Sequence, residues 1–234
     1  LAFVMHGLGG NKEKPTVKTL MQGFIEENIT CVRFDTTNTF GESYGEYEKA
    51  TVTNYYEDLE DVIEWAKTQK FYQEPFFLTG HSLGAMSIIL YAEKFSEKVK
   101  GLVPASSVIS GKLSLDTERY KGNDIIKNWK ETGWYKRESH GKIKNLPWSH
   151  MEDRLKYDVL ENADKLTMPV LIIVGELDDG CPPEHQKLLY NNLPGKRELH
   201  IVKGAPHSFD KKEEQEEIIK TIKSWIGKSD SVIL

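Results

Sequence analysis

The chain has 234 residues, with 36 acidic and 31 basic side chains and a formal net charge of -5. Charges of both signs are mixed along it, so no cationic block offers nucleic-acid phosphates a continuous surface, and nucleic acid is not expected as a partner. The longest apolar runs, such as residues 170–174, are far too short for a membrane span, and no signal peptide is recognisable. Cys31 and Cys181 belong to no CxxC pair and are expected to be free thiols. The composition predicts a soluble, cytoplasmic protein of one domain, without a cofactor or metal site.

Short strands and amphipathic helices alternate along the chain. Apolar runs bounded by turn residues predict strands at residues 1–5, 29–34, 75–79, 99–104, 170–174 and 198–202. Apolar residues at helical spacing predict helices at residues 15–28, 54–66, 80–95 and 212–225. Asn54 and Glu57 have the spacing of a capping box at the start of the second helix. The alternation predicts an α/β fold, with a mostly parallel sheet flanked by helices on both faces.

Residues 106–168 interrupt this alternation. The stretch is too long for an ordinary connection between elements, and it is rich in charged and aromatic residues. We expect a cap inserted into a core formed by residues 1–105 and 169–234, and a variable loop is the alternative. The cap's tryptophans and tyrosines are expected to offer flat apolar walls that select the substrate.

A serine motif falls where a predicted strand gives way to a helix. Gly80-His81-Ser82-Leu83-Gly84 fits G-x-S-x-G, and its place in the chain is that of a nucleophile elbow, a strained turn that exposes the serine hydroxyl. Chance produces such five-residue patterns often, so the strand-to-helix position decides the interpretation. Ser82 is the candidate nucleophile, and His81 is expected to be structural.

A serine hydroxyl needs a base, and the base needs an orienting acid. Asp178 follows the predicted strand 170–174, and His207 follows the last predicted strand, so both come at strand carboxyl ends, where catalytic groups gather in open α/β sheets. Either residue alone is more often a turn or surface residue. Together with Ser82, in the order Ser, Asp, His, they predict a catalytic triad.

Attack on a carbonyl also needs two donors for the developing oxyanion. The backbone N–H of Leu83, first in its helix, is one candidate. The second is the N–H of Leu8, in the glycine-rich turn His6-Gly7-Leu8-Gly9-Gly10 after the first strand. A glycine-rich turn without a task is the alternative.

These motifs together resemble the α/β-hydrolase superfamily over nearly the whole chain. The resemblance rests on HGLGG, RFD, GHSLG, GELDDGCPPE and GAPHSF, and within the superfamily the chain is most similar to small carboxylesterases, including cinnamoyl or feruloyl esterases and monoacylglycerol-lipase-like enzymes. It implies the α/β-hydrolase fold with an inserted cap, Ser82, Asp178 and His207 as triad, and Leu8 and Leu83 as oxyanion donors. It also implies two strands before Leu1, so residues upstream are expected to be missing from this sequence.

The predicted activity is hydrolysis of small to medium acyl esters or aromatic, cinnamoyl-type esters through an acyl-enzyme. Esters are favoured over amides because alkoxides leave more readily. Thioesters and small peptides or amides remain alternative substrates. A non-catalytic binding member of the fold is the alternative from another class.

Overall fold

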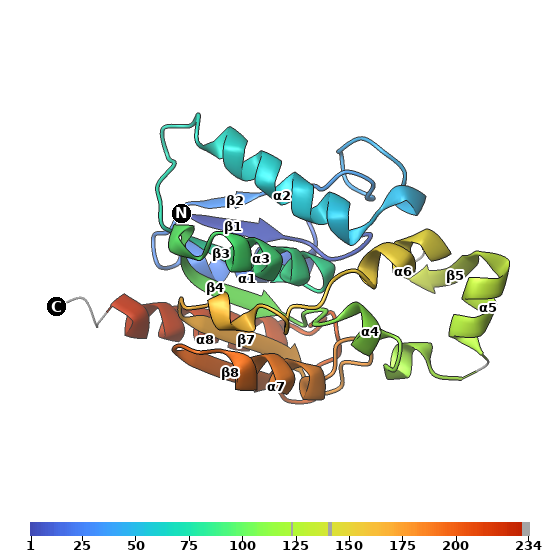
Figure 1. Cartoon of the computed structure of the whole chain (residues 1–234). Helices are drawn as coiled ribbons and strands as arrows, with labels where there is room; N and C mark the ends of the chain where they lie inside the picture. Colours follow the sequence, from blue (N-terminus) through green and yellow to red (C-terminus); the bar gives the residue numbers. More distant parts are fainter. Residues whose placement is uncertain (123, 140–141, 231–234) are drawn as a thin grey trace.

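The computed structural model describes residues 1–122, 124–139 and 142–230 and contains one six-stranded, parallel sheet (Figure 1). In the order of the sheet, the strands are β2 (Cys31–Arg33), β1 (Ala2–Met5), β3 (Phe76–His81), β4 (Val99–Ala105), β7 (Val170–Gly175) and β8 (Arg197–Val202). All residues of β1 and β7 are buried, as expected for parallel strands covered on both faces. The predicted α/β fold is confirmed, and each predicted strand forms.

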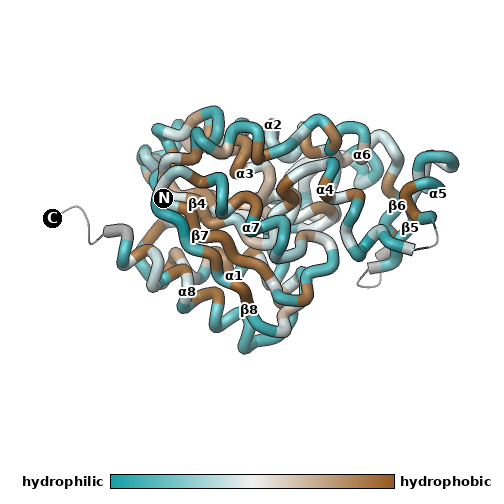
Figure 2. Tube along the Cα trace, turned by 60° about the horizontal axis from the view of Figure 1, so that its bottom comes forward, coloured by the Kyte–Doolittle hydropathy of each residue, from teal (hydrophilic) through white to brown (hydrophobic). Residues whose placement is uncertain are grey.

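Helices cover both faces of this sheet. One apolar layer lies between the sheet and α1 (Pro15–Ile25) and α8 (Lys212–Asp230). The other lies between the sheet and α2 (Val52–Ala66), α3 (Leu83–Lys94) and α7 (Pro183–Asn192). Figure 2 shows the most hydrophobic stretches of the trace along β4 and β7, in the middle of the molecule. None of the helices in the described part of the chain is both long and apolar enough to span a bilayer.

The second helix begins earlier than its sequence pattern suggested. The Thr51 side chain accepts a hydrogen bond from the Asn54 amide at 3.0 Å, so Thr51 is the N-cap and α2 starts at Val52. Asn54 therefore lies inside the first turn, and its predicted role in a capping box was wrong. Threonine and asparagine both cap helices well, and the apolar pattern alone does not choose between them.

Most of the described residues of the segment 106–168 form small elements beyond the carboxyl ends of the strands, at the end toward which the arrows in Figure 1 point. They comprise α4 (Gly111–Ser114), α5 (Ile125–Thr132), the antiparallel hairpin of β5 (Trp134–Ser139) and β6 (Lys142–Pro147), and α6 (Trp148–Arg154). The last part of the segment, which includes Val159 and Leu166, runs back to the start of β7 and packs in the main core. Short 3-10 turns complete the chain at η1 (Tyr47–Lys49), η2 (Ser96–Lys98), η3 (Glu118–Tyr120) and η4 (Ala163–Lys165). Residues 106–168 are called the insert below.

Glu93 is a buried carboxyl in α3 and makes the stability of the fold sensitive to pH. Burial raises its pKa to about 8, whereas a carboxyl in the unfolded chain titrates near pH 4.3. Between these values the folded state keeps a proton that the unfolded state releases. The free energy of unfolding should therefore fall as the pH rises through this window.

We expect Glu93→Gln to remove this pH dependence. At pH 8 the variant should exceed the parent in free energy of unfolding by about 4 to 5 kcal/mol, and at pH 4 the two should be nearly equal. Urea denaturation at both pH values measures the difference, with Glu97→Gln, which removes an exposed carboxyl nearby, as the control. A gain of the same size at both pH values would contradict a protonated Glu93.

Candidate active site

Ser82 occupies a sharp turn between β3 and α3. Its backbone has φ 56° and ψ -115°, a conformation that is costly for any residue with a side chain. The Ser82 amide donates to the Ala105 carbonyl on β4 at 2.9 Å, which ties the turn to the sheet. Its Oγ lies 3.1 Å from Nε2 of His207. The strained turn thus presents the hydroxyl to an imidazole rather than to the helix that follows.

Two glycines allow the Ser82 turn and the glycine-rich turn after β1 to pack together. A Cβ on Gly84 would collide with the His6 carbonyl oxygen, and one on Gly7 would lie 2.9 Å from Cβ of Ser82. Both contacts are too close for a side chain without a shift of the backbone. The two motifs therefore lie against each other, as in a nucleophile elbow beside its oxyanion loop.

His207 comes from the loop after β8 and lies between Ser82 and Asp178. Its Nδ1 lies 2.9 Å and 2.8 Å from the two carboxylate oxygens of Asp178. An imidazole that donates from Nδ1 to Asp178 leaves Nε2 free to accept the Ser82 hydroxyl proton. The structure thus brings together the three side chains that the sequence proposed, in an order suited to proton transfer.

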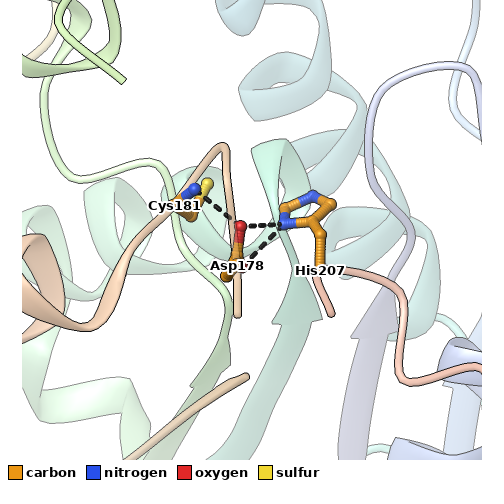
Figure 3. Close-up of side chains that lie close together, drawn as sticks. All are labelled: Asp178, Cys181 and His207. Atoms are coloured by element: carbon orange, nitrogen blue, oxygen red, sulfur yellow. Dashed lines mark hydrogen bonds and ion pairs between the residues drawn. The ribbon is translucent and has the colours of Figure 1, made fainter. Parts of the chain in front are cut away.

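Asp178 is buried in the turn after β7 (Figure 3). Besides His207, its Oδ1 accepts the amides of Gly180 at 2.9 Å and Cys181 at 2.8 Å. Burial alone would raise the pKa of this carboxyl, but the neighbouring His207 and the hydrogen bonds from His207 and the Cys181 amide hold the pKa well below its usual range. Asp178 is therefore ionised at neutral pH and can stabilise a protonated imidazole.

Cys181 brings a thiol to the same place, so a metal must be considered. Asp178, Cys181 and His207 each offer a ligand atom within 4.8 Å of the others. Burial, followed by the charge of Asp178, raises the pKa of the Cys181 thiol far above its usual value. Metal ligation needs the thiolate, and the Asp178 oxygens already accept hydrogen bonds. These residues fit an acid and imidazole pair better than a metal site.

His81 supports the loop that carries His207. Its Nε2 lies 2.8 Å from the His207 main-chain oxygen, and the two imidazole rings pack with centroids 4.7 Å apart. Burial, together with the charge of His207, lowers the pKa of His81 to about 3. His81 is therefore neutral, and it donates from Nε2 to the carbonyl of His207. Its place is that of a positioning residue rather than a second base.

Leu8 and Leu83 line the space above Ser82. Leu83 begins α3, and Leu8 lies in a turn that is closed by the Gly10 amide donating to the Gly7 carbonyl at 2.8 Å. Within the described ranges, neither the Leu8 nor the Leu83 amide donates to another protein group. The start of α3 also carries the positive end of the helix dipole. Both amides are thus available to an oxygen that becomes negative.

A cavity of about 480 Å³ lies over these groups and is bordered by the insert. Ser82 and His207 line its floor, together with Leu8 and Leu83. The insert contributes two tyrosines and four cationic side chains, namely Tyr120, Tyr135, Arg119, Arg137, Lys144 and Arg154.

The tryptophans of the insert have another role than the one expected from the sequence. Trp129 is 1 % exposed and packs edge-on against Trp148, with ring centroids 5.6 Å apart, while Trp134 is 53 % exposed. Trp129 and Trp148 belong to a small apolar cluster of the insert. Among the described residues that line the cavity, the aromatic ones from the insert are Tyr120 and Tyr135. The described residues with which the insert lines the cavity are therefore tyrosines and cationic residues, together with Val108 and Leu146, and not tryptophans.

Comparison with known proteins decides the family. A model described as "Prolyl oligopeptidase family" matches residues 16–230, a range that contains Ser82, Asp178 and His207. The chain belongs to the prolyl oligopeptidase family. This family member is a hydrolase with the α/β-hydrolase fold, which confirms the superfamily that the sequence motifs indicated.

The individual relatives of this chain are distant in sequence. An uncharacterized 31.7 kDa protein of Escherichia coli, from the traX-finO intergenic region, is 26% identical over 88% of this chain and 82% of its own length. A proline iminopeptidase of Saccharolobus solfataricus is 25% identical over 75% of this chain and 68% of its own length. The structure of Est1E from Butyrivibrio proteoclasticus with bound ferulic acid superposes with a TM-score of 0.82 at 21% identity, covering 98% of this chain and 89% of that one.

The cationic side chains of the cavity were missed by the sequence analysis. A compositional signal existed, because three of the chain's five arginines, Arg119, Arg137 and Arg154, fall in the insert. They are spread over 36 positions among many lysines and carboxylates, so no motif connects them. Only the folding of the insert brings all three to one cavity.

Proposed function

We propose that this chain is a serine hydrolase that cleaves carboxylic esters through an acyl-enzyme. Ser82 is the nucleophile, His207 the general base and acid, and Asp178 the residue that orients and stabilises the imidazole. The observation that carries the proposal is the chain of contacts from Asp178 to His207 Nδ1 and from His207 Nε2 to Ser82 Oγ. The family membership and the strained turn at Ser82 support it.

In the first half of the reaction, Ser82 Oγ forms a bond to the carbonyl carbon while His207 Nε2 takes the hydroxyl proton. The carbonyl electrons move to the oxygen, which the amides of Leu8 and Leu83 stabilise. When the intermediate collapses, the bond to the alcohol breaks, and His207 returns the proton to the departing alkoxide. The alcohol leaves, and the acyl group remains on Ser82.

In the second half, a water molecule takes the place of the alcohol. His207 removes a proton from the water as its oxygen bonds to the acyl carbon, and the same two amides stabilise the second oxyanion. The bond to Ser82 Oγ then breaks, and His207 restores the serine hydroxyl proton. The products are the free acid and the original enzyme, and Asp178 stabilises the protonated imidazole in both halves.

The insert, residues 106–168, is proposed to act as a cap that selects the substrate. Eight of its described residues line the cavity above Ser82, which supports this role. The phenol rings of Tyr120 and Tyr135 provide flat surfaces for an acyl or aromatic group. Residues 1–105 and 169–234 then form the catalytic core.

Peptide hydrolysis is the second candidate, because the family is named for a peptidase and one relative is called a proline iminopeptidase. A free amino terminus needs carboxylates to bind it. Among the described residues that line the cavity, the carboxylates are Asp179 and Asp210, and Asp179 is ion-paired with Arg119 at 2.7 Å. The cationic cavity therefore suits a neutral or anionic substrate better than a peptide with a free ammonium group.

A panel of substrates separates the two candidates. We expect kcat/KM for p-nitrophenyl butyrate to exceed that for proline p-nitroanilide by about 100-fold or more, which corresponds to about 3 kcal/mol in barrier. Ethyl ferulate tests whether an aromatic acyl group is accepted. Faster cleavage of the proline anilide than of both esters would reverse the assignment in favour of a peptidase.

A further inference from the structure

The cavity above Ser82 is rich in positive charge, although the whole chain carries a net charge of -5. The cationic side chains that line it are Lys14, Arg119, Arg137, Lys144 and Arg154. Among the described lining residues, two carboxylates, Asp179 and Asp210, face these five cations. Such a concentration of one sign in a concave site attracts ligands of the opposite sign.

Arg154 is the one buried residue among these five cations. The residue is only 6 % exposed, and its Nη2 donates to Nε2 of His150 at 2.7 Å. His150 in turn donates from Nδ1 to the Ala50 carbonyl at 2.7 Å, and burial, with the charge of Arg154, lowers the pKa of His150 to about 3. The partner of Arg154 is therefore a neutral imidazole.

No carboxylate in the described part of the chain forms an ion pair with Arg154, and its Nε is buried without a hydrogen-bond partner. A buried cation without a counter-charge is costly. An anion in the cavity would supply the missing charge.

The other two arginines of the insert help to define the site. The charge of Arg119 is already matched, because it pairs with Asp179 at 2.7 Å. Arg137 lies on the hairpin strand β5 and forms no ion pair with any residue that the structure describes. Arg137 and Arg154 thus border one cavity from two elements of the insert, and both can donate to an incoming anion.

Lys144, on the partner strand β6, extends the same surface toward the catalytic groups. A Cβ on Gly9 would lie 3.3 Å from Nζ of Lys144, so the ammonium group is close to the turn that contains Leu8. Arginine guanidinium groups bind the oxygens of carboxylates and phosphates in pairs, which lysine does not do. Three of the chain's five arginines line this cavity, which fits the binding of a carboxylate or phosphate by paired hydrogen bonds.

We propose that the cavity selects esters that carry a second, anionic group, a carboxylate or a phosphate, and that Arg137 and Arg154 bind this group while Ser82 attacks the ester. The inference rests on the proposed function, because it names the substrate class of the same site. Half-esters of dicarboxylic acids are the simplest members of this class.

A matched pair of substrates tests the preference. The ester p-nitrophenyl hydrogen glutarate carries a carboxylate that p-nitrophenyl pentanoate lacks. We expect kcat/KM for the glutarate half-ester to be at least about tenfold higher at low salt, because a charged hydrogen bond is gained. The ratio should decline as ionic strength rises.

Arg154→Gln and Arg137→Gln should each lower the ratio toward one. Lys136→Gln is the matched control, since Lys136 neighbours Arg137 on β5, its side chain points to the other face of the hairpin, and it does not line the cavity. Thermal unfolding identifies loss of folding in Arg154→Gln, and the exposed Arg137 provides the test if that occurs. If the ratio of kcat/KM for the glutarate half-ester to that for the pentanoate were the same in Arg137→Gln as in Lys136→Gln, the assignment of Arg137 to anion binding would be overturned.

Binding without chemistry separates this inference from the proposed function. Calorimetric titration of the Ser82→Ala variant with glutarate should show binding that Arg137→Gln weakens, even if the protein hydrolyses no ester. Titration with inorganic phosphate shows which of the two anions the site prefers. If the protein hydrolyses both esters with nearly equal kcat/KM and binds neither anion, the anion site is refuted, while the proposed serine hydrolase activity is not.

Discussion

Ser82→Ala is expected to abolish ester turnover, with a fall in kcat of about five to six powers of ten, the scale that loss of the nucleophile has in serine proteases. The substitution removes Oγ, the atom that we propose bonds to the substrate carbonyl. The contacts of His207 with Asp178, the amides of Leu8 and Leu83 and the walls of the cavity all remain. Binding should therefore persist while chemistry is lost.

The fold should survive this substitution. The Ser82 amide still donates to the Ala105 carbonyl, and the Cβ that lies close to Gly7 is unchanged. Alanine adopts the strained turn no less readily than serine does. Initial rates on p-nitrophenyl butyrate, with thermal unfolding as the check on folding, measure the effect. A stable Ser82→Ala protein that keeps more than a few per cent of the activity would exclude Ser82 as the nucleophile.

Asp178→Asn should have the second-largest effect, lowering kcat by about three to four powers of ten. An amide at this position no longer offers two anionic oxygens to His207 Nδ1, so the imidazole is held in the wrong tautomer and its protonated form loses its counter-charge. The buried amides of Gly180 and Cys181 would also lose the charged acceptor that they share. Steady-state kinetics at neutral pH measure the loss.

The neighbouring Asp179 is the matched control. Its side chain is half exposed and pairs with Arg119 rather than with His207, so Asp179→Asn should cost less than about tenfold in kcat/KM, as for other exposed ion pairs. The two variants differ by one position on the same turn. If Asp179→Asn were the severely impaired variant, the acid would have been assigned one residue too early.

Much of this architecture could be read from the sequence because local patterns and tertiary packing agree. The run at residues 170–174 is apolar at every position, and a short run of this kind, rich in β-branched residues, is typical of a strand that is covered on both faces. Ser82, Asp178 and His207 each come at or after the carboxyl end of a strand in this parallel sheet. In a parallel sheet the carboxyl ends share one edge, so their order along the chain sufficed to predict that they meet.

The insert could not be predicted in the same way. The strands β5 and β6 are rich in lysine, arginine and glutamate, so their alternation carries little hydrophobic signal. The aromatic side chains attracted attention, but Trp129 is needed to fill the insert's own small core. The environment of Arg154 depends on His150 one turn earlier and on Ala50 more than 90 residues away. Only the folded chain brings such a set together.

Covalent labelling tests the identity of the nucleophile most directly. A fluorophosphonate reacts with a serine only when a base and an oxyanion site activate it. After brief exposure of the native protein, peptide mapping by mass spectrometry should find one adduct per chain, on Ser82, and none in Asp178→Asn within the same time. An unlabelled Ser82, or a label on another residue, would contradict the proposed mechanism and favour a binding protein that kept the fold without the catalysis.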